Sequence, residues 1–169
     1  KSYFHINDEA INDYTRVTEI DPLHVKAYFN LGCLKQEMQN YGDAIFDYTK
    51  VIDIEPVNIA AIFNRGNARL SMGKYFDAIE DFDTVISINA EDERFYINRG
   101  NAKGKLYNFN EAIEDYTKSI SLNPNSDLAF FNRGLSYLNL NRKKSACFDF
   151  HKAVELGSTI AAEHINKFC

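Results

Sequence analysis

The chain has 169 residues, of which 45% are hydrophobic and 25% charged, and this composition is typical of a folded globular protein rather than of a disordered or collagen-like chain. A net charge of −5 disfavours nonspecific binding to nucleic acids, because that binding depends on an excess of Lys and Arg. No apolar run in the sequence approaches the roughly 20 residues that span a bilayer, so we expect a soluble protein without a membrane partner.

Small residues recur along the chain at a fixed interval of 34 residues. Each copy has a glycine, an alanine twelve residues later and an aromatic residue four after that. The glycines are Gly32, Gly66, Gly100 and Gly134; the alanines are Ala44, Ala78, Ala112 and Ala146; the aromatic residues are Tyr48, Phe82, Tyr116 and Phe150. Such self-similarity indicates a stack of repeated units.

Apolar residues within each copy follow a helical rather than an alternating spacing, so each copy is predicted to hold two helices. In chain order we expect helices at residues 7–20, 25–38, 41–54, 59–72, 75–88, 93–106, 109–122, 127–140 and 143–156, and a closing helix within 158–169. Pro22, Pro56 and Pro124 follow three of the second helices, and proline cannot continue a helix. The predicted organisation is one domain over residues 1–169: the second helix of a partial repeat at 1–20, four full repeats at 21–157 and the closing helix.

The recurring glycines predict close contact between the two helices of each copy. Glycine inside a helix costs about 0.5–1 kcal/mol relative to alanine, so its repetition at one position needs a compensating gain. We expect that gain to come from close helix contact at the glycine of the first helix and the alanine of the second, with the neighbouring aromatic rings filling the space beside the crossing.

With glycine, alanine, aromatic residue and proline at these offsets, the chain resembles the tetratricopeptide repeat family over nearly its whole length. The resemblance implies an all-α fold: a right-handed superhelical solenoid of antiparallel helix pairs. The end copies depart from the pattern, because Asn7 and Lys143 stand where the inner copies open their second helix with an aromatic residue. The sequence also begins on a second helix, and we therefore expect further residues upstream of Lys1 in the native chain.

A column of arginines precedes three of the glycines. Arg65, Arg99 and Arg133 stand where the first full copy has Leu31 and where the resembled family more often has leucine. A buried arginine needs a carboxylate, because an unpaired buried charge is costly. We therefore predict a ladder of ion pairs with the aspartates that recur on the second helices, Asp47, Asp81, Asp115 and Asp149.

A column of asparagines is the candidate binding site. The resemblance implies that the first helices line a concave groove, where an amide can both donate to and accept from the backbone of an extended peptide. Neighbouring apolar residues would contact the side chains of that peptide. The candidate residues are Phe29, Asn30, Phe63, Asn64, Asn67, Ile97, Asn98, Asn101, Phe131 and Asn132. The alternative is that asparagine merely suits an exposed helical position and that the aromatic rings pack between units.

Relatives that bind the acidic tails of heat-shock chaperones use Lys and Arg beside such asparagines, and that basic pair is missing here. Lys26, Arg94 and Lys105 are scattered and do not rebuild it. We therefore expect a neutral or apolar peptide rather than an acidic chaperone tail.

No catalytic or metal-binding pattern stands out, so we expect a noncatalytic scaffold for protein interactions without a cofactor or a metal. Cys33, Cys147 and Cys169 are odd in number and far apart, and we interpret them as free thiols, which fit a reducing cytoplasm. Three alternatives remain: the chain is the repeat arm of a larger enzyme, it self-associates through its N-terminal end, or it is an RNA-binding helical repeat, which the 34-residue period and the acidic balance disfavour.

Overall fold

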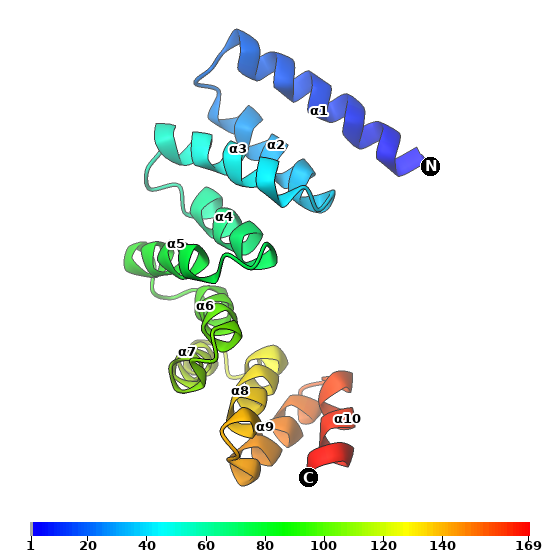
Figure 1. Cartoon of the computed structure of the whole chain (residues 1–169), viewed down its shortest axis with the longest axis vertical. Helices are drawn as coiled ribbons and strands as arrows, with labels where there is room; N and C mark the ends of the chain where they lie inside the picture. Colours follow the sequence, from blue (N-terminus) through cyan, green and yellow to red (C-terminus); the bar gives the residue numbers. More distant parts are fainter. Residues whose placement is uncertain (1) are drawn as a thin grey trace. The chain divides into compact units, whose positions relative to one another are not determined.

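The computed structural model describes residues 2–169, with side chains from Asp8 onward, and within that range every regular element is an α-helix. In order along the chain the helices are α1 (Ser2–Ile20), α2 (Val25–Glu37), α3 (Tyr41–Ile54), α4 (Ile59–Ser71), α5 (Tyr75–Ile88), α6 (Glu93–Lys105), α7 (Phe109–Leu122), α8 (Asp127–Asn139), α9 (Lys143–Glu155) and α10 (Thr159–Phe168). They follow one another as consecutive helix pairs (Figure 1). The helices fall into two compact units: the N-terminal unit, which ends at Ile88, and the C-terminal unit, which runs from Asn89 to Cys169.

The helix bounds agree closely with those predicted from the period. The first helices α2, α4, α6 and α8 each end one residue earlier than expected, and three of the other helices match at both ends. The clear difference is α1, which begins at Ser2 rather than at residue 7. No glycine or proline lies between Ser2 and Asn7, so nothing in the sequence stops the helix from extending toward the N-terminus.

Each first helix starts at a capping residue that recurs at the 34-residue interval. The side chains of His24, Asn58, Asp92 and Ser126 accept a hydrogen bond from a backbone N–H in the first turn of α2, α4, α6 and α8, respectively. Such a side chain satisfies one of the N–H groups that a helix start leaves without an internal partner.

The turn between the two helices of a repeat has a left-handed residue at a fixed position. Gln39, Gly73, Tyr107 and Asn141 all have φ between 57° and 76°. Only Gly73 takes this conformation without a steric penalty. A second helix can also end where no proline follows it. Helix α5 stops at Ile88 although Ala90 stands at the position that proline takes in three other repeats.

Close contact at the recurring glycines is present in all four full repeats, and the aromatic ring lies directly against the glycine rather than beside the crossing. A Cβ built on Gly32, Gly66, Gly100 or Gly134 would lie between 2.6 and 2.8 Å from a ring carbon of the aromatic residue on the following helix. Those rings belong to Tyr48, Phe82, Tyr116 and Phe150, and each is almost fully buried. The glycines therefore let each helix pair pack closely around one buried ring.

The C-terminal helix α10 lies within the predicted range 158–169 and has one buried face. Ala161 is fully buried, while Glu163, Asn166 and Lys167 are exposed. No helix among the described residues is long and apolar enough to cross a membrane.

Candidate functional site

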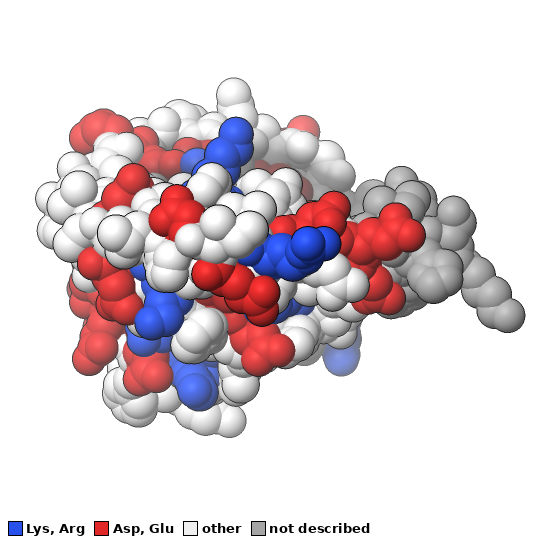
Figure 2. Space-filling view, turned by 90° about the horizontal axis from the view of Figure 1, so that it is seen from above, with Lys and Arg blue, Asp and Glu red and all other residues white. Residues whose placement is uncertain are grey.

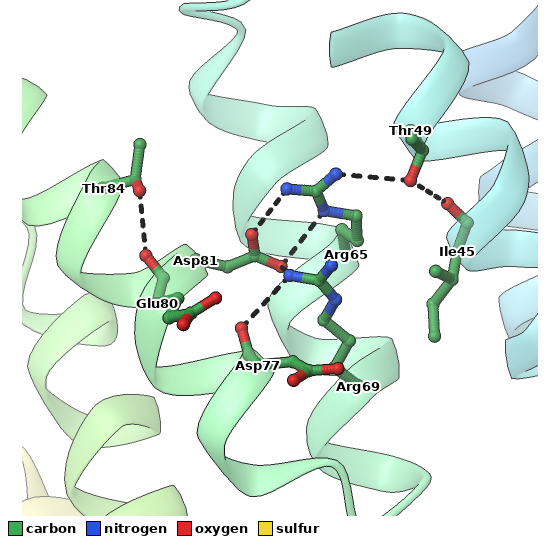
Figure 3. A network of polar contacts seen from close by, with 8 residues as sticks. All are labelled: Ile45, Thr49, Arg65, Arg69, Asp77, Glu80, Asp81 and Thr84. Atoms are coloured by element: carbon green, nitrogen blue, oxygen red, sulfur yellow. Dashed lines mark hydrogen bonds and ion pairs between the residues drawn. The ribbon is translucent and has the colours of Figure 1, made fainter. Parts of the chain in front are cut away.

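A ladder of buried ion pairs joins the two helices of three repeats, as predicted. Arg65 and Asp81 form two parallel hydrogen bonds of 3.2 and 2.7 Å between α4 and α5 (Figure 3). Arg99 pairs with Asp115 and Arg133 with Asp149 in the same way within the C-terminal unit. Paired bonds between a guanidinium and a carboxylate fix the orientation of both groups, so the ladder sets the register of each helix pair.

A second cation reaches two of these carboxylates one helical turn after the arginine. Arg69 Nη1 lies 2.7 Å from Asp81 Oδ2, and Lys103 Nζ lies 2.9 Å from Asp115 Oδ2. In the last repeat Tyr137 takes the corresponding position, and its ring lies 6.0 Å from the Arg133 guanidinium. The sequence analysis did not predict this second cation, although Lys35, Arg69 and Lys103 also recur at the 34-residue interval.

The first full repeat lacks the arginine, and its aspartate is held differently. Lys35 Nζ lies 2.6 Å from Asp47 Oδ2, and the Asp47 side chain is 3% exposed. Burial raises the pKa of the Asp47 carboxyl above its ordinary value, and the Lys35 ammonium opposes part of that rise. A single ammonium therefore offsets less of the cost of burying this carboxylate than the arginine pairs do elsewhere.

In the C-terminal unit, asparagines of two successive first helices lie in direct contact. Asn132 Nδ2 on α8 donates to Asn101 Oδ1 on α6 at 3.0 Å, and the Tyr116 hydroxyl donates to the same oxygen at 2.8 Å. Burial raises the pKa of the Tyr116 hydroxyl, which keeps this donor protonated. The bond uses one of the two N–H groups of Asn132, and its amide retains further capacity to donate and accept.

In the N-terminal unit a thiol takes the place of the second amide. The Tyr48 hydroxyl and the Asn64 amide both approach Cys33 Sγ, at 3.6 and 4.0 Å. Cys33 lies 68 residues before Asn101, two repeat lengths, so the two clusters are equivalent. Both clusters place an amide of one first helix beside a polar group of the preceding first helix.

The other candidate residues of the column are half-buried, with one exception. Asn30, Asn67 and Asn98 are intermediate in exposure, and so are Phe29, Phe63 and Phe131. Ile97 is only 6% exposed and therefore has little surface to offer a ligand.

Each phenylalanine of the column also packs on the second helix of its own repeat. The ring centroids of Phe29 and Tyr48, of Phe63 and Phe82, and of Phe131 and Phe150 are 5.9 Å apart in each case. These contacts leave part of each ring exposed.

One prediction about the cysteines is wrong. Cys147 and Cys169 form a disulfide, which joins α9 to the residue after α10, and only Cys33 is free. The separation of 22 residues equals the interval from each repeated alanine to the next glycine, and Cys169 has the phase of Cys33, so the disulfide joins α9 to the end of α10 where a second helix meets the next first helix. The argument for a reducing cytoplasm therefore loses its basis for two of the three cysteines.

The charged side chains give no continuous basic surface on the face drawn in Figure 2, where acidic and basic groups of the described residues are interspersed. Lys26 and Lys105 are exposed, and Arg94 pairs with Asp92 at 2.6 Å. Among the described residues no three His, Cys, Asp or Glu side chains gather as metal ligands.

Two family models, both described as tetratricopeptide repeat, match the chain. One matches residues 94–126, and the other matches residues 25–58, 59–92 and 128–156. A search of curated proteins found no match.

Three solved structures illustrate the likeness of the fold. A crystal structure of MamA is 26% identical, covers 92% of this chain and 91% of its own, and superposes with a TM-score of 0.86. The Arabidopsis OM64 TPR domain is 25% identical, with 65% and 93% covered and a TM-score of 0.63. The first TPR of Spaghetti (RPAP3), bound to the HSP90 peptide SRMEEVD, is 23% identical, with 65% and 89% covered and a TM-score of 0.63.

Proposed function

Because the chain belongs to the tetratricopeptide repeat family, whose fold serves as a scaffold for protein interactions, we propose that it is a noncatalytic scaffold that binds an extended peptide or a partner helix along the faces of its first helices. The observation that carries the proposal is the contact between Asn101 and Asn132. This contact supports the proposal, because amides that touch across two successive first helices could pair with the same ligand.

The amide groups of that contact suit a peptide backbone. An extended chain presents an N–H and a C=O at every residue, and an amide can pair with either group whatever the side chain. Asn64 on α4 occupies the equivalent position in the N-terminal unit, beside Cys33. Partly exposed rings of Phe29 and Phe131 would then contact the side chains of the ligand.

The charges favour a ligand other than an acidic tail. The peptide in the solved Spaghetti (RPAP3) structure, SRMEEVD, carries three acidic residues. In this chain the candidate cation Arg94 is already paired with Asp92. The net charge of −5 would repel an acidic peptide further.

A pull-down from native extract tests the proposal. The test variant combines Asn64→Ala, Asn98→Ala and Asn132→Ala, and the matched control is Asn110→Ala, an exposed asparagine on the second helix α7. Both proteins must show the helical circular dichroism and melting behaviour of a folded chain. We expect partners captured by the wild type and by the control to be lost from the triple variant, and retention of every partner by a folded triple variant would refute the proposal.

A further inference from the structure

A polar pocket of about 330 Å³ opens in the N-terminal unit between α2, α3 and α4. Its lining includes the cluster of Cys33, Tyr48 and Asn64 described above and adds Gln36 and Glu37 from the last turn of α2. This volume lies at the lower end of the range for small-molecule pockets, and it is large enough for one amino-acid side chain.

Within the described part of the chain, the hydrogen bonds of the pocket leave one acceptor, the Gln36 side-chain oxygen, without a donor. The amide N–H of Asn64 and the hydroxyl of Tyr48 are both directed at Cys33 Sγ, and burial raises the pKa of that hydroxyl, which stays protonated. Gln36 Oε1 is buried and accepts no hydrogen bond from any group of the described residues. Buried acceptors in native proteins almost always have a partner, so this oxygen favours a ligand that brings a donor.

The charges around the pocket have one sign. Among the described residues, Glu37 carries the only carboxylate in the lining of the pocket, and no Lys, Arg or His side chain lines it. Helix α2 ends at Glu37 and α4 ends at Ser71, which also lines the pocket, and the C-terminal end of a helix carries a partial negative charge. Helix α3 begins at Tyr41 with the opposite partial charge, but Asp43 in its first turn offsets that end.

We propose that this pocket binds the cationic side chain of a Lys or Arg residue in the peptide, an inference that rests on the proposed function. The ammonium or guanidinium would lie near the Glu37 carboxylate, and the Gln36 side chain would turn so that its Oε1, which is buried in the free protein, accepts from it. The ring of Tyr41, which is half-buried, would contact the aliphatic part of the side chain.

The pocket is particular to the N-terminal unit. Two repeat lengths further along the chain, Gly104 replaces Gln36 and Lys105 replaces Glu37. The equivalent place in the C-terminal unit therefore lacks the buried acceptor and carries the opposite charge. A peptide with one basic residue would consequently bind with that residue at the N-terminal unit.

The charge preference of the pocket can be measured at Cys33, the free thiol. The probes are the cationic aminoethyl methanethiosulfonate and the anionic sulfonatoethyl methanethiosulfonate. The rate at which each probe labels Cys33 is divided by its rate with a small free thiol, which removes the difference in intrinsic reactivity. We expect the normalised rate to favour the cationic probe by on the order of tenfold. Glu37→Gln should reduce this ratio and Glu37→Lys should invert it, whereas Glu80→Lys, an equal charge change at an exposed residue outside the pocket, should leave it nearly unchanged. An anionic preference, or a ratio that Glu37→Lys leaves unchanged, would overturn the inference.

Binding of defined peptides separates this inference from the proposed function. The probes are three pools of eight-residue peptides with blocked ends, random uncharged flanks and a central Lys, Gln or Glu. We expect the immobilised protein to retain the Lys pool about tenfold more than the Gln pool, and Glu37→Gln to abolish only that preference. Retention that depends on the asparagines but is equal for the three pools would refute the pocket and leave the proposed function standing. No retention of any pool, combined with cation-selective labelling, would refute peptide binding and support the charge preference.

Discussion

Replacing Gly100 by alanine isolates the contact between glycine and ring on which each helix pair depends. A Cβ at Gly100 would lie 2.8 Å from Tyr116 Cε1, and real Cβ atoms do not approach a ring carbon that closely. Gly104, one turn later on α6, is the matched control, because a Cβ there would meet nothing nearer than the Tyr116 hydroxyl at 3.9 Å. The two variants thus share a helix and an aromatic neighbour and differ in steric overlap.

The magnitude follows from two opposing terms. Alanine gains about 0.5–1 kcal/mol over glycine within a helix, and this term applies to both variants. Overpacking a well-filled core costs about 1–3 kcal/mol, and this term applies to Gly100→Ala alone. We expect Gly104→Ala to be neutral or stabilising, Gly100→Ala to be destabilising, and the two to differ by about 1–3 kcal/mol in the free energy of unfolding.

Urea denaturation followed by circular dichroism at 222 nm measures the difference. If the free energy of unfolding falls by about 2 kcal/mol per molar urea, the unfolding midpoints of the two variants should be separated by about 0.5–1.5 M. Midpoints that coincide, or a higher midpoint for Gly100→Ala, would refute the argument that the glycine column exists to admit the ring.

Three further predictions concern the buried charges and the disulfide. Arg133→Met should destabilise the protein by about 3–5 kcal/mol, because it leaves a buried carboxylate without its cation, whereas Arg99→Met should cost less, because a lysine on α6 stays 2.9 Å from the carboxylate there. Equal midpoints of these two variants in urea would contradict the role of the second cation. Cys169→Ser should lower stability by about 3 kcal/mol, since the disulfide closes a loop with a sequence separation of 22, and the loss should match that caused by reductant in the wild type. A variant as stable as the oxidised wild type would argue against the disulfide. Because burial raises the pKa of Asp47, the folded chain binds more protons than the unfolded chain between pH 3.8 and that raised pKa, and stability falls as pH rises through this window. Measured against Asp47→Asn, the wild type should therefore gain relative stability as pH is lowered from 7 toward 4, and a relative loss would reverse the sign that we assign.

Most of the fold could be predicted from the sequence because its signals are local and repeated. Glycine, alanine and aromatic residue at one phase specify a helix pair, and four copies remove the ambiguity that a single copy would have. The ion pairs of Arg65, Arg99 and Arg133 followed from one physical rule, that a buried guanidinium needs a carboxylate. The start of α1 was predicted five residues too late because the repeat pattern, and not a stop signal, defined the expected boundary.

The candidate site was less accessible to sequence reasoning. The contact between Asn101 and Asn132 joins residues 31 apart, and no periodicity states which groups of neighbouring repeats touch. Cys33 was treated as an isolated thiol, although its phase, shared with Asn67 and Asn101, placed it in the polar column. Cys169 shares the phase of Cys33, but a shared phase does not predict a covalent bond, and the Cys147–Cys169 disulfide became visible only in the packing of α10 on α9.

The side-chain amide signals of the asparagines, recorded by NMR as a captured peptide is added, test the central claim most directly. If an extended ligand binds along the first helices, the amides of Asn64, Asn101 and Asn132 shift with the same saturation curve. Backbone signals around Phe46 and Phe148, exposed residues of the second helices α3 and α9, then stay in place. Shifts that gather around those two phenylalanines while the asparagine amides do not move would contradict the account.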